Sequence, residues 1–560
     1  MIELICLTTL LVQAPPAPPP PRPPVQVQRD PAATKKGTAV IKGHVRSADG
    51  RPLRRAQIRA WTGDQRDALT TTTGLDGEYE LTELPAGRYT LEATRSGYLR
   101  IQYGAANFGE RGTPIEVTEG GKLEKIDFLL SRAGVVSGRV TDETGEAVAG
   151  VDIRAMQLQF YRGRKRVVPV STFPVHVTTD DSGQYRLTGL PPGEYFIWGR
   201  LPETWMSDEK DPQMLSYAPT YFPGTADVAD ARRVKIAAGQ EAGAIDFMLL
   251  PMRAATLSGT ALASDGAPLT RGRLILSLEI MGPGGGTMGF AGNAVINEDG
   301  TWKITDVAPG EYTIRATGSV GDRSAETAVL PVSVYGIDLE GLIVTADAGG
   351  LISGRIVTDT GEPLPSSGSR PTVATTPVSM LTGTVRPVRG QDDGVAGPDG
   401  RFTLRSPSGP VAVRVFSLPR GWSIRTIDIG GRDFAGFPVE VPPGGTLGGV
   451  TIVISNRLPS LKGRITGADG TVPERATVLL FPIDPARWIE AAANQRTVRP
   501  DPTGVYSFDA VRPGEYFVVA LQSMESWEMN DPDFLTVQKD RATKVTIGAE
   551  PVTIDLEVQR

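Results

Sequence analysis

The chain has 560 residues, 40% of them hydrophobic and 22% charged, which is the composition of a globular protein with more than one core. A formal net charge of −6 excludes a dedicated nucleic-acid binder, which needs a strongly basic face. The 65 glycines and 46 prolines indicate many turns, and the single cysteine excludes an intramolecular disulfide bond.

The N-terminal segment predicts export. Residues 4–12 read LICLTTLLV, the apolar core of a signal peptide that we expect over residues 1–14. A helix needs about 20 residues to span a bilayer, and no later segment is a transmembrane candidate. Residues 15–36 are expected to form a disordered, proline-rich linker of extended character. We therefore expect an extracytoplasmic protein, whether periplasmic, cell-surface or secreted.

Beyond the linker, three phrases recur five times in the same order. The first carries two glycines seven residues apart, at Gly43 and Gly50, Gly138 and Gly145, Gly259 and Gly266, Gly354 and Gly361, and Gly463 and Gly470. The second reads LDGEYEL, DSGQYRL, EDGTWKI, PDGRFTL and PTGVYSF. The third reads LPAGRYTLEA, LPPGEYFIWG, VAPGEYTIRA, SPSGPVAVRV and VRPGEYFVVA. Recurrence at a near-constant period indicates a tandem array of similar units.

Each phrase is typical of strand, turn and strand. Asp-Gly and Asp-x-x-Gly supply the positive-φ and side-chain-capped positions of tight hairpins. Apolar alternation follows, as in Tyr79 with Leu81. About seven short strands per unit predict an all-β chain, a tandem array of five antiparallel, immunoglobulin-like β-sandwich domains. The best helix candidate is residues 485–495, PARWIEAAANQ, inside a loop.

The repeats set the expected domain boundaries. We call the five predicted β-sandwiches units 1 to 5, at residues 37–132, 133–252, 253–347, 348–456 and 457–560. Unit 2 carries an aromatic insert, and unit 4 is divergent because Val411 stands where the other third phrases have tyrosine.

These phrases resemble the carboxypeptidase regulatory-like domain: a first strand with Gly-x-Val or Gly-x-Ile, an Asp-x-x-Gly-x-Tyr turn and a Pro-Gly-x-Tyr turn. The resemblance covers nearly the whole chain after residue 37. It implies a transthyretin-like β-sandwich, similar to collagen-adhesin B-type repeats and to carbohydrate-binding-like folds. It leaves function open, because such modules occur as spacers, adhesin stalks and appendages of enzymes.

Residues with catalytic chemistry are scarce. His44 and His176 are the only histidines, and neither belongs to the His-x-x-Glu pair of a zinc carboxypeptidase. Residues 284–289, GGGTMG, match a phosphate-loop pattern, but a strand-like segment follows instead of a helix, which favours a hairpin loop. We expect no catalytic residue, no metal site and no cofactor.

Carboxylate clusters such as TDETG (141–145), TDDSG (179–183) and QDDG (391–394) stand where the hairpins need turns. We interpret them as turn residues. Calcium binding is the alternative, although they lack the dense oxygen ligands of a dedicated loop.

The third phrase of units 2 and 5 has apolar residues on both strand faces. Phe196 and Trp198, and Phe517 and Val519, stand where other units have polar residues. Large bare apolar faces are unfavourable and suggest a covered or binding surface. Both units carry long inserts after this strand. Either each insert folds back over the face, or its aromatic rings form a platform that stacks on sugars or a protein partner.

The candidate ligand-binding residues on this second interpretation are Trp198, Trp205, Tyr217, Tyr221, Phe222 and Trp527. The sequence thus predicts a non-enzymatic, exported rod that acts as a binding or adhesive scaffold of the cell envelope, with carbohydrate as ligand. The alternative is a purely structural spacer, or an assembly partner of an envelope protein complex without a small-molecule ligand.

Overall fold

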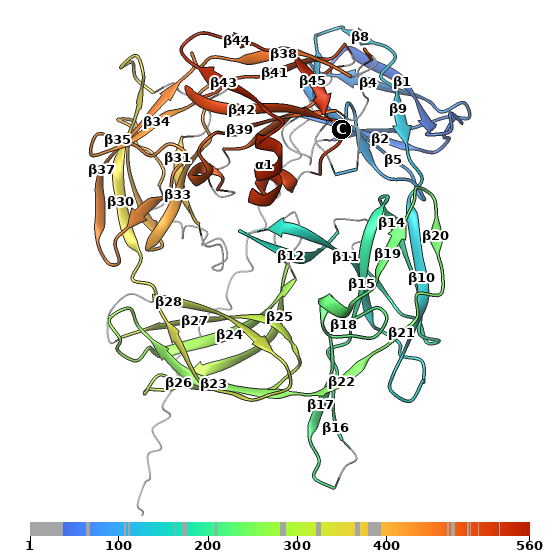
Figure 1. Cartoon of the computed structure of the whole chain (residues 1–560), viewed down its shortest axis with the longest axis vertical. Helices are drawn as coiled ribbons and strands as arrows, with labels where there is room; N and C mark the ends of the chain where they lie inside the picture. Colours follow the sequence, from blue (N-terminus) through green and yellow to red (C-terminus); the bar gives the residue numbers. More distant parts are fainter. Residues whose placement is uncertain are drawn as a thin grey trace, which may run out of the picture.

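Figure 1 shows the computed structural model of the chain, which is built almost entirely of strands. The structure describes residues 37–559 except 63–67, 106–107, 110–111, 162, 171–175, 208–209, 281–286, 321–325, 365–369, 379–393, 420, 468–469, 472–475, 490–491, 493, 502 and 526. The expected signal peptide and proline-rich linker lie outside this range. Within it, strands pair with strands of the same unit, and the one strand that crosses a predicted boundary, Leu250–Arg253, pairs with unit 2.

Unit 1 packs two sheets around one core. The first sheet contains β1 (Ala39–Ser47), β4 (Glu78–Leu84), β8 (Lys122–Leu123) and β9 (Phe128–Leu130). The second contains β2 (Gln57–Trp61), β3 (Leu69–Thr72), β5 (Gly87–Thr94), β6 (Ile101–Gln102) and β7 (Ile115–Val117). Strand β1 shows the pattern behind this packing, because its inward side chains are buried and most of its alternate ones are exposed.

Unit 2 repeats this plan and adds a third, small sheet. The first sheet contains β10 (Gly134–Thr141), β14 (Gln184–Leu190), β20 (Glu241–Ala242) and β21 (Phe247–Met248). The second contains β11 (Asp152–Tyr161), β12 (Arg164–Pro169), β13 (Val177–Thr178), β15 (Gly193–Arg200), β18 (Thr220–Tyr221) and β19 (Arg233–Ile236). The third contains β16 (Thr204–Met206), β17 (Met214–Ala218) and β22 (Leu250–Arg253). Its 3-10 turn η2 spans Val228–Asp230.

Units 3 and 4 are also two-sheet sandwiches, each with its own core. In unit 3 the sheets are β23 (Ala255–Leu262), β26 (Thr301–Val307) and β29 (Leu339–Thr345), then β24 (Thr270–Ile280), β25 (Thr287–Ile296), β27 (Gly310–Ser319) and β28 (Glu326–Val334). In unit 4 they are β30 (Gly350–Thr358), β32 (Arg401–Ser406), β34 (Ser423–Ile429), β35 (Arg432–Asp433) and β37 (Thr446–Ser455), then β31 (Thr372–Pro377), β33 (Gly409–Phe416) and β36 (Val439–Val441).

Unit 5 has a core of its own, and its closing strand pairs with both groups of strands and so joins them. The groups are β38 (Leu461–Thr466), β41 (Val505–Phe508), β44 (Val552–Thr553) and β45 (Leu556–Gln559), then β39 (Thr477–Pro482), β40 (Arg496–Val498), β42 (Gly514–Leu521) and β43 (Thr543–Ile547). Its helical elements are η3 (Pro485–Arg487), η5 (Glu528–Asn530) and α1 (Pro532–Lys539).

The first strand of each unit lies between an antiparallel and a parallel neighbour. In unit 1, β1 pairs antiparallel with β4 and parallel with β8 and β9. The same parallel pairing with the closing strand recurs for β10, β23, β30 and β38. The β-sandwich class is therefore as predicted, but each first sheet is mixed and not purely antiparallel.

Residues from two of the recurring phrases contact the same backbone carbonyl. Gly138 lies opposite Tyr185 in the β10–β14 pair. A side chain at Gly138 would collide with the carbonyl oxygen of Ile245, and the Tyr185 hydroxyl donates to that same oxygen at 2.7 Å. Units 1 and 5 repeat this arrangement with Gly43, Tyr79 and Ile126, and with Gly463, Tyr506 and Ile554.

The sequence expectation of a helix at residues 485–495 was wrong. In their described part these residues form the 3-10 turn η3, a further 3-10 residue at Ala492, and irregular structure. The helix α1 arises instead at Pro532–Lys539, where the Asp531 carboxylate accepts the Asp533 N–H at 3.0 Å and proline occupies the first turn. No helix among the described residues combines the length and apolar character required to cross a membrane.

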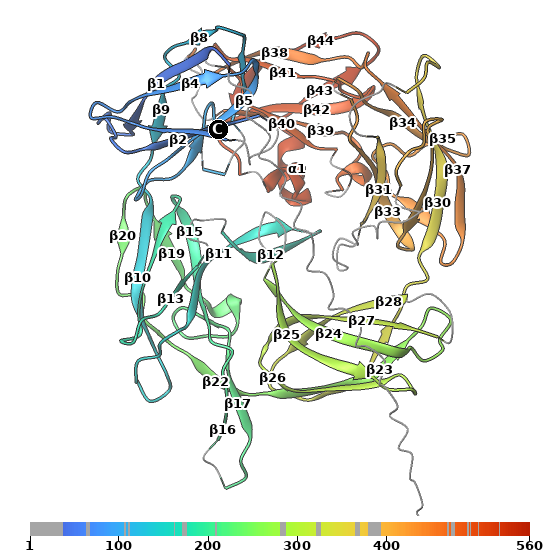
Figure 2. The same ribbon diagram turned by 180° about the vertical axis from the view of Figure 1, so that it is seen from behind.

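The units follow one another around a ring, and unit 5 returns to lie beside unit 1 (Figures 1 and 2). The expected rod is therefore wrong. Across the ring, the β11–β12 hairpin of unit 2 faces the helical segment of unit 5, where the Lys165 ammonium lies 3.3 Å from Asp531 and 2.9 Å from Asp533. Such contacts between distant units have no signature in a repeat pattern.

Candidate functional site

The structure buries two of the six predicted ligand-binding residues. Trp198 and Phe222 are each only 7% exposed. Phe222 belongs to the main core of unit 2, whereas Trp198 packs on the opposite face of β15 with Phe196 and Met156. Neither ring offers a face to a ligand.

The insert of unit 2 covers the second face of β15, as the first of the two interpretations predicted. The chain returns as β18, so that Tyr221 pairs with Trp198. Tyr221 meets the Phe196 ring edge-on at a centroid distance of 6.5 Å, and Val228 of η2 packs against the same small core. The guanidinium groups of Arg154 and Arg233 lie over the Trp198 and Phe196 rings.

The insert of unit 5 likewise covers the second apolar face of β42, but with helical elements. Phe517, Val519 and Leu535 are buried in one cluster, to which α1 contributes Leu535. Trp488 also joins this cluster and donates its indole N–H to the Pro482 carbonyl at 2.8 Å. The predicted ligand residue Trp527 is half-buried where η5 begins.

Trp205 and Tyr217 form a half-exposed ring pair on the β16–β17 hairpin. Their centroids are 4.6 Å apart with an interplanar angle of 45°. The hairpin projects from the ring of units at its lower edge (Figure 1). Burial, followed by the carboxylates of Glu143, Asp142 and Glu203, raises the pKa of Tyr217 to about 12. The pair thus combines an aromatic surface with hydrogen-bond acceptors.

Tyr221 faces unit 3 rather than this pair. Its pKa is raised to about 12, first by burial and then by Tyr335 and Glu311 of unit 3. The Tyr335 hydroxyl donates to the Glu311 carboxylate at 2.8 Å. The six predicted residues therefore do not form one platform, and only Trp205 and Tyr217 are brought together as an accessible pair.

The acidic clusters TDETG (141–145) and TDDSG (179–183) act as turn residues, whereas residues 391–393 of QDDG lie outside the described residues. The Asp180 carboxylate accepts the Ser182 hydroxyl at 2.7 Å and the backbone N–H groups of Ser182 and Gln184, each at 2.9 Å. These bonds, led by the Ser182 hydroxyl, lower the pKa of Asp180. Asp142 and Asp501 show the same pattern. Among the described residues, no group of three potential ligands is placed to hold a metal ion.

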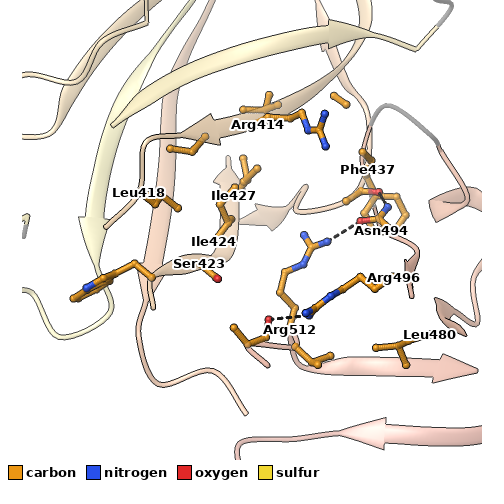
Figure 3. Close-up of a pocket in the computed structure, with 18 of the residues that line it drawn as sticks. Arg414, Leu418, Ser423, Ile424, Ile427, Phe437, Leu480, Asn494, Arg496 and Arg512 are labelled. Carbon is orange, nitrogen blue, oxygen red and sulfur yellow. Dashed lines mark hydrogen bonds between the residues drawn. The ribbon is translucent and has the colours of Figure 1, made fainter. Parts of the chain in front are cut away.

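A pocket that sequence reasoning missed lies between units 4 and 5 (Figure 3). It has a volume of about 300 Å³, within the range of small-molecule sites. Its unit 4 wall comes from β33, β34 and the loops around them, and its unit 5 wall from β39, β40 and the loop before β42. The apolar lining includes Leu418, Trp422, Ile424, Ile427 and Phe437.

Three half-buried arginines, Arg414, Arg496 and Arg512, line the pocket. The Arg512 guanidinium donates to the side-chain oxygen of Asn494 at 2.7 Å, and Arg496 donates to the Ala510 carbonyl at 3.4 Å. Burial lowers the pKa of Arg496 and of Arg512. Because the three arginines come from two repeats, no local sequence pattern brings them together.

Asn494 holds the two walls together. Its amide nitrogen donates to the Gly436 carbonyl of unit 4 and to the Arg487 carbonyl of unit 5, both at 2.7 Å. Arg487 also donates to the Ala435 carbonyl at 3.2 Å and lies over the Phe437 ring. The pocket therefore belongs to the junction of the units and not to either unit alone.

The family comparison agrees with the repeat phrases. Residues 40–131 and 135–197 match the model of the carboxypeptidase regulatory-like domain. These two stretches lie in units 1 and 2, so the likeness to carboxypeptidase regulatory-like domains is found there. A search of curated proteins finds no match.

Among solved structures, three pilins illustrate the resemblance. The streptococcal ancillary pilin is 12% identical, with 55% of this chain and 98% of that chain covered and a TM-score of 0.20. BcpA, the major pilin subunit of Bacillus cereus, is 12% identical over 55% and 99%, with a TM-score of 0.14. GBS52, the minor pilin of Streptococcus agalactiae, is 13% identical over 38% and 98%, with a TM-score of 0.18.

Proposed function

We propose that the protein is a non-enzymatic, extracytoplasmic scaffold that binds carbohydrate through the Trp205–Tyr217 pair. The observation that carries this proposal is the half-exposed ring pair, 4.6 Å between centroids, on a hairpin that projects from the ring. Flat rings stack on the apolar faces of sugars, while carboxylates such as Glu143 and Glu203 accept sugar hydroxyls. The extracytoplasmic location rests on the signal-like segment at residues 4–12.

The test is a glycan array with the full chain, followed by titration of any bound glycan against variants. Trp205→Ala and Tyr217→Ala remove one ring each, and we expect each to weaken binding about tenfold. Phe416→Ala is the matched control, because Phe416 is an exposed aromatic residue of unit 4, 52% accessible, away from the hairpin. Equal binding by Trp205→Ala and Phe416→Ala would reject the site.

A purely structural spacer, or an envelope assembly partner, is the second candidate. The burial of Trp198 and Phe222 favours it, because these two of the six candidate rings already stabilise the fold. If the full chain binds no glycan while Trp198→Ala melts several degrees lower, this alternative accounts for the insert better.

A further inference from the structure

The pocket between units 4 and 5 concentrates positive charge on its described lining residues. Among the described residues that line it, Arg414, Arg496 and Arg512 are charged and none is Asp or Glu. Guanidinium groups stay protonated in proteins, and buried charges are normally paired. An unpaired cluster of like charges in a half-buried site is unfavourable unless an anion joins it.

The two carboxylates whose charges act on Arg496 and Arg512 are hydrogen-bonded to other groups. The Asp433 carboxylate accepts the backbone N–H groups of Ile427 and Ala435 at 2.9 and 2.8 Å. The Asp509 carboxylate accepts the Ser507 hydroxyl at 2.9 Å. Neither forms an ion pair with Arg496 or Arg512 in the part of the chain that the structure describes, although each acts on the charge of one of them at longer range.

The hydrogen bonds of the arginines leave donors free for a ligand. A guanidinium has five N–H donors, and the interactions of Arg512 use one neutral amide oxygen while those of Arg496 use one long bond to a carbonyl. Arg487, just behind the pocket, has a buried Nε without a hydrogen-bond partner. The electrostatic field in this junction is therefore positive.

We infer that this pocket binds a small organic anion, with a carboxylate group among the guanidiniums and an apolar body against the unit 4 wall. A carboxylate matches the planar donor fork of arginine and can accept two parallel hydrogen bonds. Leu418 and Ile424 supply apolar surface on the other side of the pocket from Arg496 (Figure 3), and Trp422 also belongs to the apolar lining. A ligand held this way touches both units and fixes the angle between them.

The test uses isothermal titration of the full chain with four probes at constant ionic strength, because free chloride screens exposed charge. Hexanoate and adipate carry one and two carboxylates on the same six-carbon chain. Hexanol lacks the charge, and inorganic phosphate lacks the apolar body. We expect hexanoate and adipate to bind, and hexanol and phosphate to bind at least tenfold more weakly.

Variants locate the binding. Arg496→Gln and Arg512→Gln each remove charge-assisted hydrogen bonds, and we expect each to weaken hexanoate binding tenfold or more. Arg414→Gln provides an independent test if the loss of the Arg512–Asn494 bond lowers stability. Arg432→Gln is the control, because Arg432 is an exposed arginine of unit 4 outside the pocket.

Three results would overturn the assignment: no heat from either carboxylate, phosphate binding as tightly as hexanoate, or equal losses in Arg414→Gln and Arg432→Gln. This site is separate from the Trp205–Tyr217 pair. A negative glycan array would therefore reject the carbohydrate proposal without affecting the anion proposal. A failure to bind carboxylates would reject only the anion proposal.

Discussion

A single carbonyl oxygen explains why two phrases of the repeat occur together. In units 1, 2 and 5, the first-strand glycine clears space for the carbonyl that the facing tyrosine hydroxyl then bonds. Units 3 and 4 keep the glycine but have Trp302 and Phe402 opposite it, so the carbonyl contact remains and the hydroxyl bond is absent there. Steric clearance is thus common to all five units, and the hydrogen bond is not.

Gly138→Ala is expected to destabilise unit 2 by about 3 kcal/mol, because overpacking against a backbone carbonyl cannot relax by a rotamer change. It also displaces the acceptor of the Tyr185 hydroxyl. Chemical denaturation monitored by circular dichroism measures the change. Gly243→Ala is the matched control, since a side chain there meets Ser137 only at an ordinary 3.7 Å and should change stability little.

For single residues, the sequence predicted which positions form turns and strands, but it did not predict which distant residues they contact. The spacing of the glycines predicted where turns and strands lie, because a positive φ or a tight turn has a local signature. The carbonyl that Gly138 makes room for belongs to Ile245, more than a hundred residues away, and only the folded register brings them together. The same limit applies to Arg414, Arg496 and Arg512.

The inserts of units 2 and 5 each cover an apolar face of a sheet. Apolar residues on both faces of β15 and β42 predicted either a cover or a binding platform, because bare aromatic faces are unfavourable in water, and the structure has the cover. What forms the cover differs: a short strand and a 3-10 turn in unit 2, and α1 with η5 in unit 5. The eight-residue α1 is too short for a periodic signal, although Asp531-Pro532 is a recognisable start.

Leu535→Ala tests whether α1 is part of the core of unit 5. Leu535 is fully buried in the cluster that contains Phe517 and Val519. Its truncation to alanine should therefore lower the free energy of unfolding by about 2–5 kcal/mol. Val537 lies two residues further along the same helix and is 54% exposed, so Val537→Ala should remain within about 0.5 kcal/mol of the wild type. Thermal unfolding of both variants compares them, and equal melting temperatures would show that α1 is dispensable.

The whole molecule depends on contacts that no single unit encodes. The Lys165 ammonium is the ion-pair partner of both Asp531 and Asp533, and the Asp533 bond leads the causes that raise its pKa. Asp531 also caps α1, so the contact places unit 2 against an ordered helix start. A repeat pattern predicts similar units, but the path from one to the next depends on such side-chain contacts.

Lys165→Glu places a negative charge beside these two aspartates and is expected to open the ring. Asp533 is exposed whereas Asp531 is buried, and both lie at the contact between units, so the charge change acts on that contact while the units themselves should keep their stability. Small-angle X-ray scattering should then show a larger radius of gyration than for the wild type. Arg164→Glu, the same charge change on the neighbouring exposed residue of β12, is the control. An unchanged radius for Lys165→Glu would mean that other contacts hold the ring.

The parallel pairing of first and closing strands has a mechanical consequence. In units 1, 3, 4 and 5 the first and last strands are neighbours that run in the same direction, and in unit 2 β10 pairs in this way with β21, the strand before the last. Tension along the chain pulls such strands past each other, so their hydrogen bonds share the load together instead of breaking one after another. An open ring of five such units would first lengthen at its junctions, and only a larger force would shear a unit apart.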